Sequence, residues 1–435
     1  MAVALFVLGV HLAESARCHF RIFLNSTKRQ ERTWIVFRLI TAAVAIYVLA
    51  LSVSLTRAQP QPDGKSIFRF DTFGSEQLWT DVLQMQHVIA EDVSPATALS
   101  VGLKVDVDAL PPAVIAALQA GQVNLNDPAV TVQLLKLNAV VGVIGKVVGA
   151  NDNLASVGIT CALCHSTVDD SFAPGIGRRL DGWANTTLNP GAILALSPAV
   201  TNKDPYLSWG PGKYDPRFRI FDGATLIPLN DPEDLTIPVV IPPAYGLDGV
   251  GFETFNGDGP ISYWNNYVAV TQMGGHGNFS DSRIGVTVTQ SPPDLVTPKL
   301  AALVQYQLGL QTPAPPNGSV NRPAARRGEE LFAGAAGCAT CHKPPLFTDV
   351  TSGPDPMVPL LHDPSDIPTD PAYAARSATK AWRTTPLRAL WQHPPYFHDG
   401  SAADLLAVVN RYNTRFLLGL TERQKADLVE FLKGL

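Results

Sequence analysis

Two motifs of the same pattern, Cys-x-x-Cys-His, constrain this 435-residue chain more than any other feature. They are Cys161-Ala-Leu-Cys164-His165 and Cys338-Ala-Thr-Cys341-His342. In each motif, two thiols three positions apart lie on one face of a helical turn, where they can form thioether bonds with the two vinyl groups of a haem. The adjacent histidine can then bind the iron. The sequence therefore predicts two covalently bound c-type haems, with His165 and His342 as proximal ligands.

Other uses of paired cysteines fit the sequence less well. A disulfide within each motif is an alternative in an exported chain. A zinc site would need further Cys or His at ligand spacing, and the fifth cysteine, Cys18, lies in a segment that we expect to be removed. A thioredoxin-like redox motif would need a surrounding βαβ pattern, which the sequence does not show. Two copies with no cysteine left over in the mature chain favour haem attachment.

The beginning of the chain has the features of a secretory signal. An uncharged run at residues 39–55 follows a basic stretch, and small residues before the polar segment place a cleavage site after Ala58. The run is just long enough for a helix that spans a membrane, so an uncleaved membrane anchor is the alternative. The long leader before the basic stretch suggests that translation starts near Arg32–Arg38 rather than at Met1. We therefore expect a periplasmic protein.

Composition and helix patterns predict a mainly α fold with two cytochrome c-like domains and long Pro/Gly-rich loops. The chain contains 36 prolines and 34 glycines, which favour ordered loops between short elements. After a signal peptide at residues 1–58, we assign 59–312 to an N-terminal haem domain with an expanded loop region, 313–321 to a linker and 322–435 to a C-terminal cytochrome c domain. The net charge of −5 gives no support for a nucleic-acid partner.

Helical patterns surround both motifs. They cover residues 76–89, 112–120, 322–335, 403–412 and 420–435. The last of them starts with the capping-box pair Thr421 and Gln424 and continues with an apolar stripe. A helix just before the second motif and a helix that ends the chain would form the crossing pair of a cytochrome c fold. We therefore expect Gly328 and Phe332 to pack against Phe431.

Two further motifs give the chain a family resemblance. They are Thr385-Pro-Leu-Arg388 and Pro395-Tyr-Phe-His398-Asp-Gly-Ser401. With them, the chain resembles the bacterial di-haem cytochrome c peroxidase and MauG superfamily, clearly over about residues 322–435 and more weakly around 155–200. The resemblance implies two haem domains in electronic contact. It also implies Tyr412 as the distal ligand of the C-terminal haem, because the family has Met or Tyr fourteen residues after the histidine of the second of these motifs.

The resemblance implies roles for neighbouring residues as well. A phenolate at Tyr412 would stabilise ferric and higher-valent iron, whereas methionine would raise the potential. His398 is a buried hydrogen-bonding residue near the haem edge. Arg388 pairs with a haem propionate, since its guanidinium offers a bidentate fork; a surface ion pair is the alternative. If Tyr412 is only a packed aromatic, then Met357, His362 or His398 ligates the iron, or nothing does.

At the N-terminal haem, Arg178 stands where the peroxidases carry a distal histidine. Arginine stays protonated and has no lone pair for iron. One interpretation is an open iron with Arg178 above it, polarising a bound peroxide. The other is that Arg178 and Arg179 neutralise propionates. If a further residue ligates this iron, the candidates are His87, Met273 and His276.

The resemblance also implies a tryptophan between the haems. Trp264 is its expected counterpart with a catalytic role, and Trp183 is the alternative, although either could be a core residue. The resemblance further implies an inter-domain calcium ion, whose ligands the motifs do not identify.

The activity that the resemblance implies is reduction of hydrogen peroxide. A small redox protein or a quinol-linked donor would supply the electrons, and a homodimer is an option. The alternatives are an electron-transfer cytochrome without a substrate and a MauG- or oxygenase-like oxidation of an organic substrate. The sixth ligand at each haem distinguishes the enzyme from the carrier.

Overall fold

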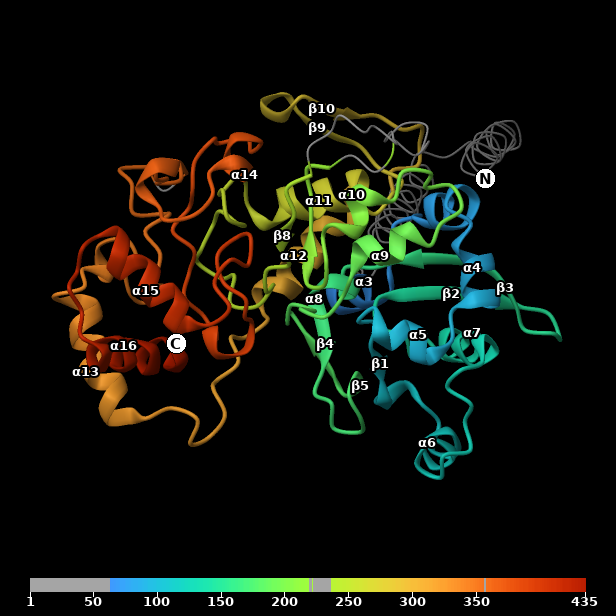
Figure 1. The fold of residues 1–435 in the computed structure, drawn as a ribbon. Coiled ribbons are helices and arrows are strands. Elements are labelled where there is room, and N and C mark those ends of the chain that lie inside the picture. The colour runs from blue at the N-terminus through green and yellow to red at the C-terminus, as the bar shows by residue number, and fades with distance from the viewer. Residues whose placement is uncertain (1–62, 219–220, 222–235, 356) are drawn as a thin grey trace, which may run out of the picture. The chain divides into compact units, whose positions relative to one another are not determined.

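Helices dominate this computed structural model, which describes residues 63–218, 221, 236–355 and 357–435 (Figure 1). The strands are short and occur in two-stranded sheets. The predicted mainly α fold is therefore confirmed. The expected signal peptide at residues 1–58 lies outside the described residues. Within the described part, none of the helices combines the length and the apolar character needed to span a bilayer.

The helices are short and are distributed along the whole described chain. Before the first motif they are α3 (Gly64–Phe70), α4 (Met85–Asp92), α5 (Pro95–Ser100), α6 (Pro112–Gln119) and α7 (Pro128–Lys136). The middle of the chain contains α8 (Ala162–His165), α9 (Pro190–Ala195), α10 (Asp204–Leu207), α11 (Ile261–Thr271) and α12 (Leu300–Leu308). The last part contains α13 (Arg322–Ala333), α14 (Ala372–Ala375), α15 (Leu405–Arg415) and α16 (Glu422–Gly434).

Many of the prolines start helices rather than extend loops. Proline occupies the first turn of α5, α7, α9 and α13, where its missing N–H costs no hydrogen bond. A polar side chain caps each of these starts: Ser94, Asp127, Asn189 and Asn321. The cap oxygen accepts from a free backbone N–H of the first turn. The high proline content is thus partly a signature of helix starts.

The first motif follows a β-hairpin, which the sequence analysis did not anticipate. The strands pair as β1 (Val105–Asp106) with β5 (Ile176–Gly177), β2 (Val143–Val148) with β3 (Asn153–Ile159), β4 (Ser166–Val168) with β6 (Arg179–Asp181), β7 (Lys213–Tyr214) with β8 (Val239–Val240), and β9 (Phe279–Asp281) with β10 (Val286–Val288). The pair β2–β3 is antiparallel and delivers the chain directly to Cys161. The sequence does contain a feature that predicts this hairpin, namely valine-rich segments on either side of a Gly-Ala-Asn-Asp turn.

The helix predicted at residues 76–89 is broken in two. A π-helical segment, Gln77–Val82, precedes α4, and Gln84 between them has a φ of 55°. A left-handed residue cannot continue a right-handed helix, so the chain changes direction there. The prediction of one continuous helix was wrong at this point.

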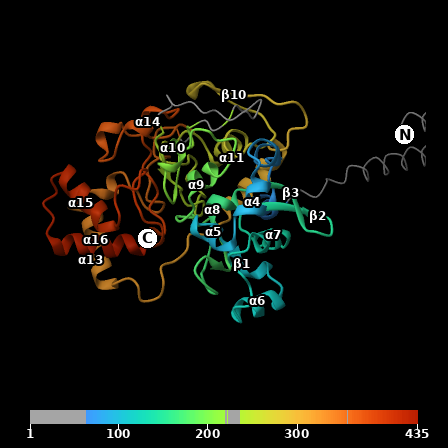
Figure 2. The ribbon, with the colours of Figure 1, turned by 45° about the vertical axis from the view of Figure 1, so that its right-hand side comes forward.

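The C-terminal helix pair forms as predicted. Thr421 and Gln424 make a complete capping box at the start of α16. Helices α13 and α16 lie side by side in both ribbon views (Figures 1 and 2), and the rings of Phe332 and Phe431 are 5.1 Å apart. At Gly328, a Cβ would lie 2.0 Å from the carbonyl oxygen of Asp427. The glycine therefore permits the close approach of the two helices.

The described residues form one compact unit with separate hydrophobic cores. The larger core includes Phe68, Trp79 and Trp264. A smaller core joins Phe332 and Leu390 to apolar residues of α15 and α16. The domain boundaries predicted from the sequence, 59–312, 313–321 and 322–435, remain a prediction. The positions of the hydrophobic cores do not define the residue at which one domain ends and the next begins.

Candidate functional site

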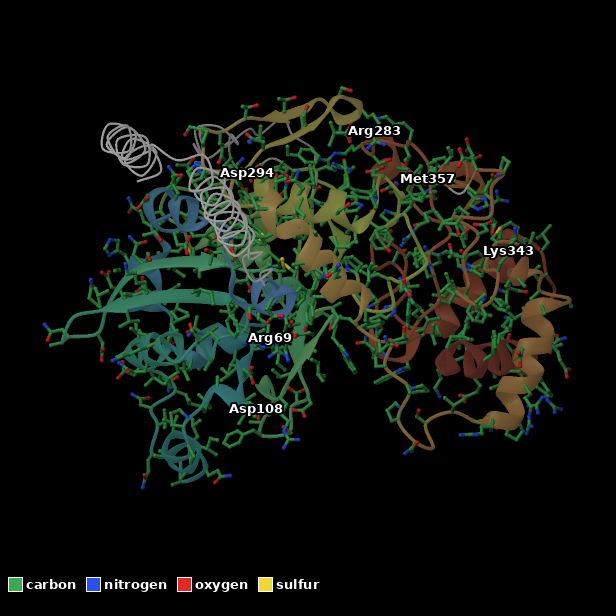
Figure 3. All side chains as sticks on the ribbon, turned by 180° about the vertical axis from the view of Figure 1, so that it is seen from behind. Arg69, Asp108, Arg283, Asp294, Lys343 and Met357 are labelled. Carbon is green, nitrogen blue, oxygen red and sulfur yellow. The ribbon has the colours of Figure 1, made fainter. Side chains whose placement is uncertain are left out.

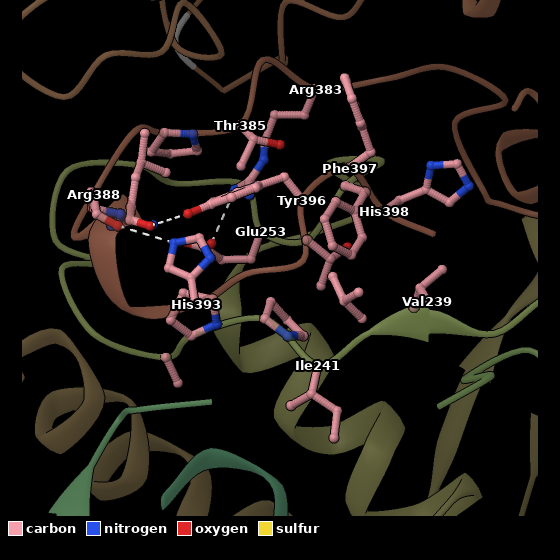
Figure 4. A pocket seen from close by; sticks show the side chains of 18 of the residues that line it. Val239, Ile241, Glu253, Arg383, Thr385, Arg388, His393, Tyr396, Phe397 and His398 are labelled. Atoms are coloured by element: carbon pink, nitrogen blue, oxygen red, sulfur yellow. Dashed lines mark hydrogen bonds and ion pairs between the residues drawn. The ribbon is translucent and has the colours of Figure 1, made fainter. Parts of the chain in front are cut away.

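One cavity of about 750 Å³ brings the two Cys-x-x-Cys-His motifs together, although 177 positions separate their histidines in the sequence. It is lined by all six motif residues and by four other predicted site residues, namely Trp264, Arg388, His398 and Tyr412. Figure 4 shows part of the wall, to which the segment from Thr385 to His398 contributes. Apolar side chains make up most of the lining. Such a mainly apolar cavity with a few placed polar groups suits a large organic cofactor.

The first motif places its histidine ready to bind a metal. The motif occupies α8, directly after strand β3. The Nδ1 atom of His165 lies 3.0 Å from the carbonyl oxygen of Pro242. Because a carbonyl only accepts, Nδ1 carries the hydrogen and Nε2 keeps its lone pair. Removal from water lowers the pKa of His165, which favours this neutral form.

The second motif reproduces this arrangement on a different scaffold. It lies on a 3₁₀ turn, Cys338–Thr340, after α13. The Nδ1 atom of His342 lies 3.0 Å from the carbonyl oxygen of Phe347, and burial lowers the pKa of His342. Metal-binding histidines commonly donate their second ring nitrogen in this way, which fixes the ring and increases ligand basicity. Two unrelated local structures thus hold a neutral imidazole by a hydrogen bond from Nδ1, which leaves the lone pair on Nε2.

The four motif cysteines are free thiols. Burial raises the pKa of Cys161 and of Cys164 to about 12, and that of Cys338 to about 11. They are therefore protonated at neutral pH as long as no cation lies beside them. Thioether attachment would leave no charge at these buried positions, so the environment fits covalent haem better than a thiolate metal site.

Arg388 supplies an unpaired positive charge to the cavity. Its guanidinium donates to no acceptor among the described residues, and its buried Nη1 atom has no partner. The nearby carboxylate of Glu253 is already engaged by Arg383 at 3.0 Å. Burial lowers the pKa of Arg388 to about 10, so it remains protonated at neutral pH. A propionate carboxylate fits this position, and the alternative of a surface ion pair is contradicted.

His398 lies on the wall of the cavity within an aromatic cage. Its ring centroid is 4.7 Å from Trp382 and 5.8 Å from Tyr373. The hydroxyl of Thr369 lies 2.9 Å from Nδ1, whereas the buried Nε2 has no partner in the described part of the chain. Loss of water lowers the pKa of His398. The side chain is thus held as a neutral, oriented imidazole.

Tyr412 projects from α15 into the cavity between two aromatic rings. Its ring stacks against Phe397 at 6.1 Å and Phe416 at 5.9 Å. Its hydroxyl has no hydrogen-bond partner among the residues described. Burial raises the pKa of Tyr412 to about 12, with a smaller contribution from the nearby motif thiols. The phenol would therefore become an anionic ligand only beside a strong compensating charge such as ferric iron.

The alternative ligands for the second motif differ in position. Met357 is 81% exposed on a surface loop (Figure 3). His362 points to Asp349 at 3.2 Å and to the hydroxyl of Thr384 at 2.9 Å, and it does not line the cavity. Of the residues considered as sixth ligands here, Tyr412 and His398 line the cavity.

Arg178 is outside the cavity, which contradicts its expected role beside a bound peroxide. Its side chain is 72% exposed and lies 4.0 Å from Asp108. The neighbouring Arg179 is buried and pairs with Asp106 at 3.0 Å. The segment is extended, so successive side chains point to opposite sides. Arg179 therefore faces inward and Arg178 faces solvent, and neither residue lines the cavity.

The candidate sixth ligands near the first motif differ in whether they line the cavity. Met273 is buried and lines the cavity, whereas His87 and His276 do not. The Nε2 atom of His276 interacts with the carbonyl of Ser291 at 2.6 Å. Met273 is thus the one of these three candidates that the structure brings to the cavity.

The two candidate tryptophans occupy different environments. Trp264 lines the cavity, donates from Nε1 to the carbonyl of Glu253 at 3.2 Å, and has the guanidinium of Arg217 5.3 Å from its ring. Trp183 packs edge-on against Trp391 at 5.6 Å and does not line the cavity. Of the two candidates, Trp264 is therefore the one that the structure places at the cavity.

Sequence reasoning missed several polar cavity residues, among them Tyr214, Gln272 and His393. The hydroxyl of Tyr214 donates to Gln272 at 2.6 Å, and burial raises the pKa of this tyrosine well above its ordinary value. No motif marked either residue. His393 also lines the cavity, and its position just before the Pro-Tyr-Phe-His-Asp-Gly motif was an available signal.

Comparison with known proteins supports the resemblance over part of the chain. No family model matches. The methylamine utilization protein MauG of Methylorubrum extorquens is 34% identical over 130 residues, which cover 26% of this chain and 34% of MauG. Cytochrome-c peroxidase IdrP1 of Denitromonas iodatirespirans is 32% identical over 149 residues, 26% of this chain and 40% of that protein. The chain thus spans 34–40% of the length of these two relatives.

A solved MauG-like protein associated with microbial copper homeostasis shares 24% identity, over 33% of this chain and 54% of that one, with a TM-score of 0.27. That structural similarity is too low to support an argument about the fold. The sequence matches confirm the resemblance to the MauG and di-haem cytochrome c peroxidase superfamily, over about a quarter of the chain.

Proposed function

We propose that this chain is an exported di-haem c-type oxidoreductase that reduces hydrogen peroxide. One haem would be attached at each Cys-x-x-Cys-His motif, within two cytochrome c-like domains. The observation that carries the proposal is the shared cavity, into which both motifs present paired thiols and a histidine held through its Nδ1 atom. The relatives named MauG and cytochrome-c peroxidase support the same class of chemistry.

The residues of the cavity have distinct roles in this proposal. Bound haem would supply one-electron storage and an iron centre for peroxide. His165 and His342 hold their rings by hydrogen bonds to backbone carbonyls and offer Nε2 to iron. Arg388 neutralises a propionate, and the apolar wall excludes water, which strengthens electrostatic interactions inside. Trp264 lies against the same cavity, where it can contribute to electronic contact between the haems.

The reaction needs two electrons and two protons to convert one hydrogen peroxide to two waters. A small redox protein or a quinol-linked donor would supply the electrons. Since Arg178 faces solvent, it is not part of this proposal. Tyr214 and Gln272 provide polar groups on the wall of the cavity, where the hydroxyl of Tyr214 donates to the side-chain oxygen of Gln272 at 2.6 Å.

An electron paramagnetic resonance spectrum of the ferric holoprotein tests the proposal. We expect one high-spin and one low-spin signal, and loss of the high-spin signal after one equivalent of peroxide, because one iron has an open position. Steady-state peroxide consumption with a reduced small cytochrome should accompany this loss. Two low-spin signals that do not respond to peroxide, before or after half-reduction, would instead indicate an electron-transfer cytochrome.

A second candidate is MauG-like oxidation of an organic substrate, and Tyr412 is the observation that favours it. Phenolate ligation stabilises ferric and higher-valent iron. Tyr412→Phe should convert the low-spin ferric signal to high-spin, since phenylalanine offers no ligand atom. Tyr396→Phe is the matched control, because Tyr396 also lines the cavity but donates its hydroxyl to the carbonyl of Leu390. An unchanged spectrum in Tyr412→Phe would exclude tyrosine ligation.

A further inference from the structure

His393 is a titratable residue of the cavity for which the proposed chemistry has not yet given a role. It lies in the short segment between Arg388 and the Pro-Tyr-Phe-His-Asp-Gly motif, and it lines the cavity that contains both Cys-x-x-Cys-His motifs. Figure 4 shows its ring beside Arg388 and above Ile241. Its ring centroid is 5.8 Å from that of Tyr396. A charge at this position would therefore lie inside the cavity rather than in solvent.

The hydrogen bonding of His393 fixes which nitrogen can accept a proton. Its Nε2 atom lies 3.3 Å from the carbonyl oxygen of Arg388. Because the carbonyl only accepts, Nε2 carries the hydrogen of the neutral ring and Nδ1 is the basic atom. The ring also lies close to the carbonyl of His393 itself, and this contact favours the protonated form. The ring is thus held in place in both of its protonation states.

The surrounding charges explain why His393 is poised to change its state. Desolvation lowers its pKa most, and the positive charge of Arg388 lowers it further, whereas the two backbone carbonyls raise it. The other titratable groups around Arg388 are the ion pair of Glu253 with Arg383 and the phenol of Tyr245. A carboxylate bound by Arg388 would offset the effect of its charge on His393. The pKa of His393 would then rise toward its ordinary range.

We propose that His393 takes up one proton at Nδ1 when the haem whose propionate pairs with Arg388 is reduced. The inference rests on the proposed binding of haem at the two motifs. An external one-electron donor reduces the ferric iron, and one proton from solvent binds Nδ1, so the total charge of the cavity does not change. No other bond forms or breaks. The structure thereby assigns to His393 the coupling of electron uptake to proton uptake, in a cavity whose proposed reaction consumes both.

The sign of the coupling determines the pH dependence of the reduction potential. If the reduced state binds the additional proton, low pH stabilises the reduced state and raises the potential. The potential of one haem should therefore fall as the pH rises between the pKa values of His393 in the reduced and oxidised states. For a one-electron couple, each tenfold change in proton concentration shifts the potential by at most about 59 mV.

Potentiometric titration of the holoprotein from about pH 5.5 to 8.5, followed in the visible absorption bands, tests this proposal. We expect a sloping potential for one haem in the unmodified protein and a flat one in His393→Gln, whose amide can still donate to the Arg388 carbonyl. His276→Gln is the control variant, because His276 lies outside the cavity and its Nε2 atom lies 2.6 Å from the carbonyl oxygen of Ser291. It should retain the slope.

Several results would overturn the proposal. A flat potential in the unmodified protein would do so without any variant, and so would a slope that persists in His393→Gln or disappears in His276→Gln. If His393→Gln does not fold, redox-induced infrared difference spectra of the unmodified protein with ring-labelled histidine replace it, and absence of an imidazolium band on reduction counts against the proposal. A protein without haem would show that the proposed function itself has failed.

Discussion

Replacing Cys338 and Cys341 together with alanine is expected to reduce the covalent haem content from two groups per chain to one. Both thiols of the pair line the shared cavity, and His342 beside them offers only a coordinate bond. Without a thioether, a haem at this motif would be held by that bond and by apolar contacts, and it would be lost under denaturing conditions. The pyridine haemochrome absorbance and the intact mass of the purified protein measure the content directly.

The complementary variant provides the control for this experiment. Replacing Cys161 and Cys164 with alanine should also leave one haem, but the remaining haem should be attached to the second motif. Peptide mapping after proteolysis distinguishes the two. Retention of two covalent haems in either double variant would contradict attachment at that motif. Loss of both haems in one variant would show that the two sites do not mature independently.

The chemistry of the two motifs could be read from the sequence because it depends on local spacing. The ring orientations of His165 and His342 follow from hydrogen bonds to the carbonyl groups of Pro242 and Phe347, and these partners could not be predicted from a pattern. For His165 the partner lies 77 positions away, in a segment without a motif. The meeting of both motifs in one cavity likewise depends on tertiary packing.

Arg178 shows how a resemblance can place the wrong residue at a site. The family position suggested Arg178, but its side chain faces solvent and the inward position belongs to Arg179. Arg179 pairs with Asp106 and also lies outside the cavity, so a shift of one position would not bring an arginine of this segment to the site. The segment has no clear alternation of apolar residues, so its sequence did not show which of its side chains face inward.

The packing of helices α13 and α16, in contrast, could be predicted, because several features of the sequence agreed with one another. A capping box and an apolar stripe defined α16, and the small residue Gly328 marked the place where the other helix could approach. The same packing gives the second prediction with a large effect. Gly328→Ala should destabilise the C-terminal helix pair, because the added Cβ would lie 2.0 Å from the carbonyl oxygen of Asp427 and 2.9 Å from the Cβ of Phe431.

Two opposing terms determine the size of this effect. Alanine favours an isolated helix over glycine by about 1 kcal/mol, whereas overpacking of a close contact typically costs about 1–3 kcal/mol and occasionally more. The first contact is with backbone, which cannot rotate away as a flexible side chain could, so we expect the cost of overpacking to dominate. The thermal unfolding midpoint of the holoprotein, followed by circular dichroism, should therefore fall in Gly328→Ala.

Gly434→Ala is the matched control, since it places the same methyl group near the end of the partner helix. The nearest atom to that Cβ would be a methyl carbon of Val320 at 3.9 Å, an ordinary van der Waals contact. Its midpoint should stay the same or rise slightly, because only the helix preference changes. If Gly328→Ala were as stable as Gly434→Ala, the two helices could not approach as closely as the structure has them. The contact between α13 and α16 would then be looser than a cytochrome c-like helix pair requires.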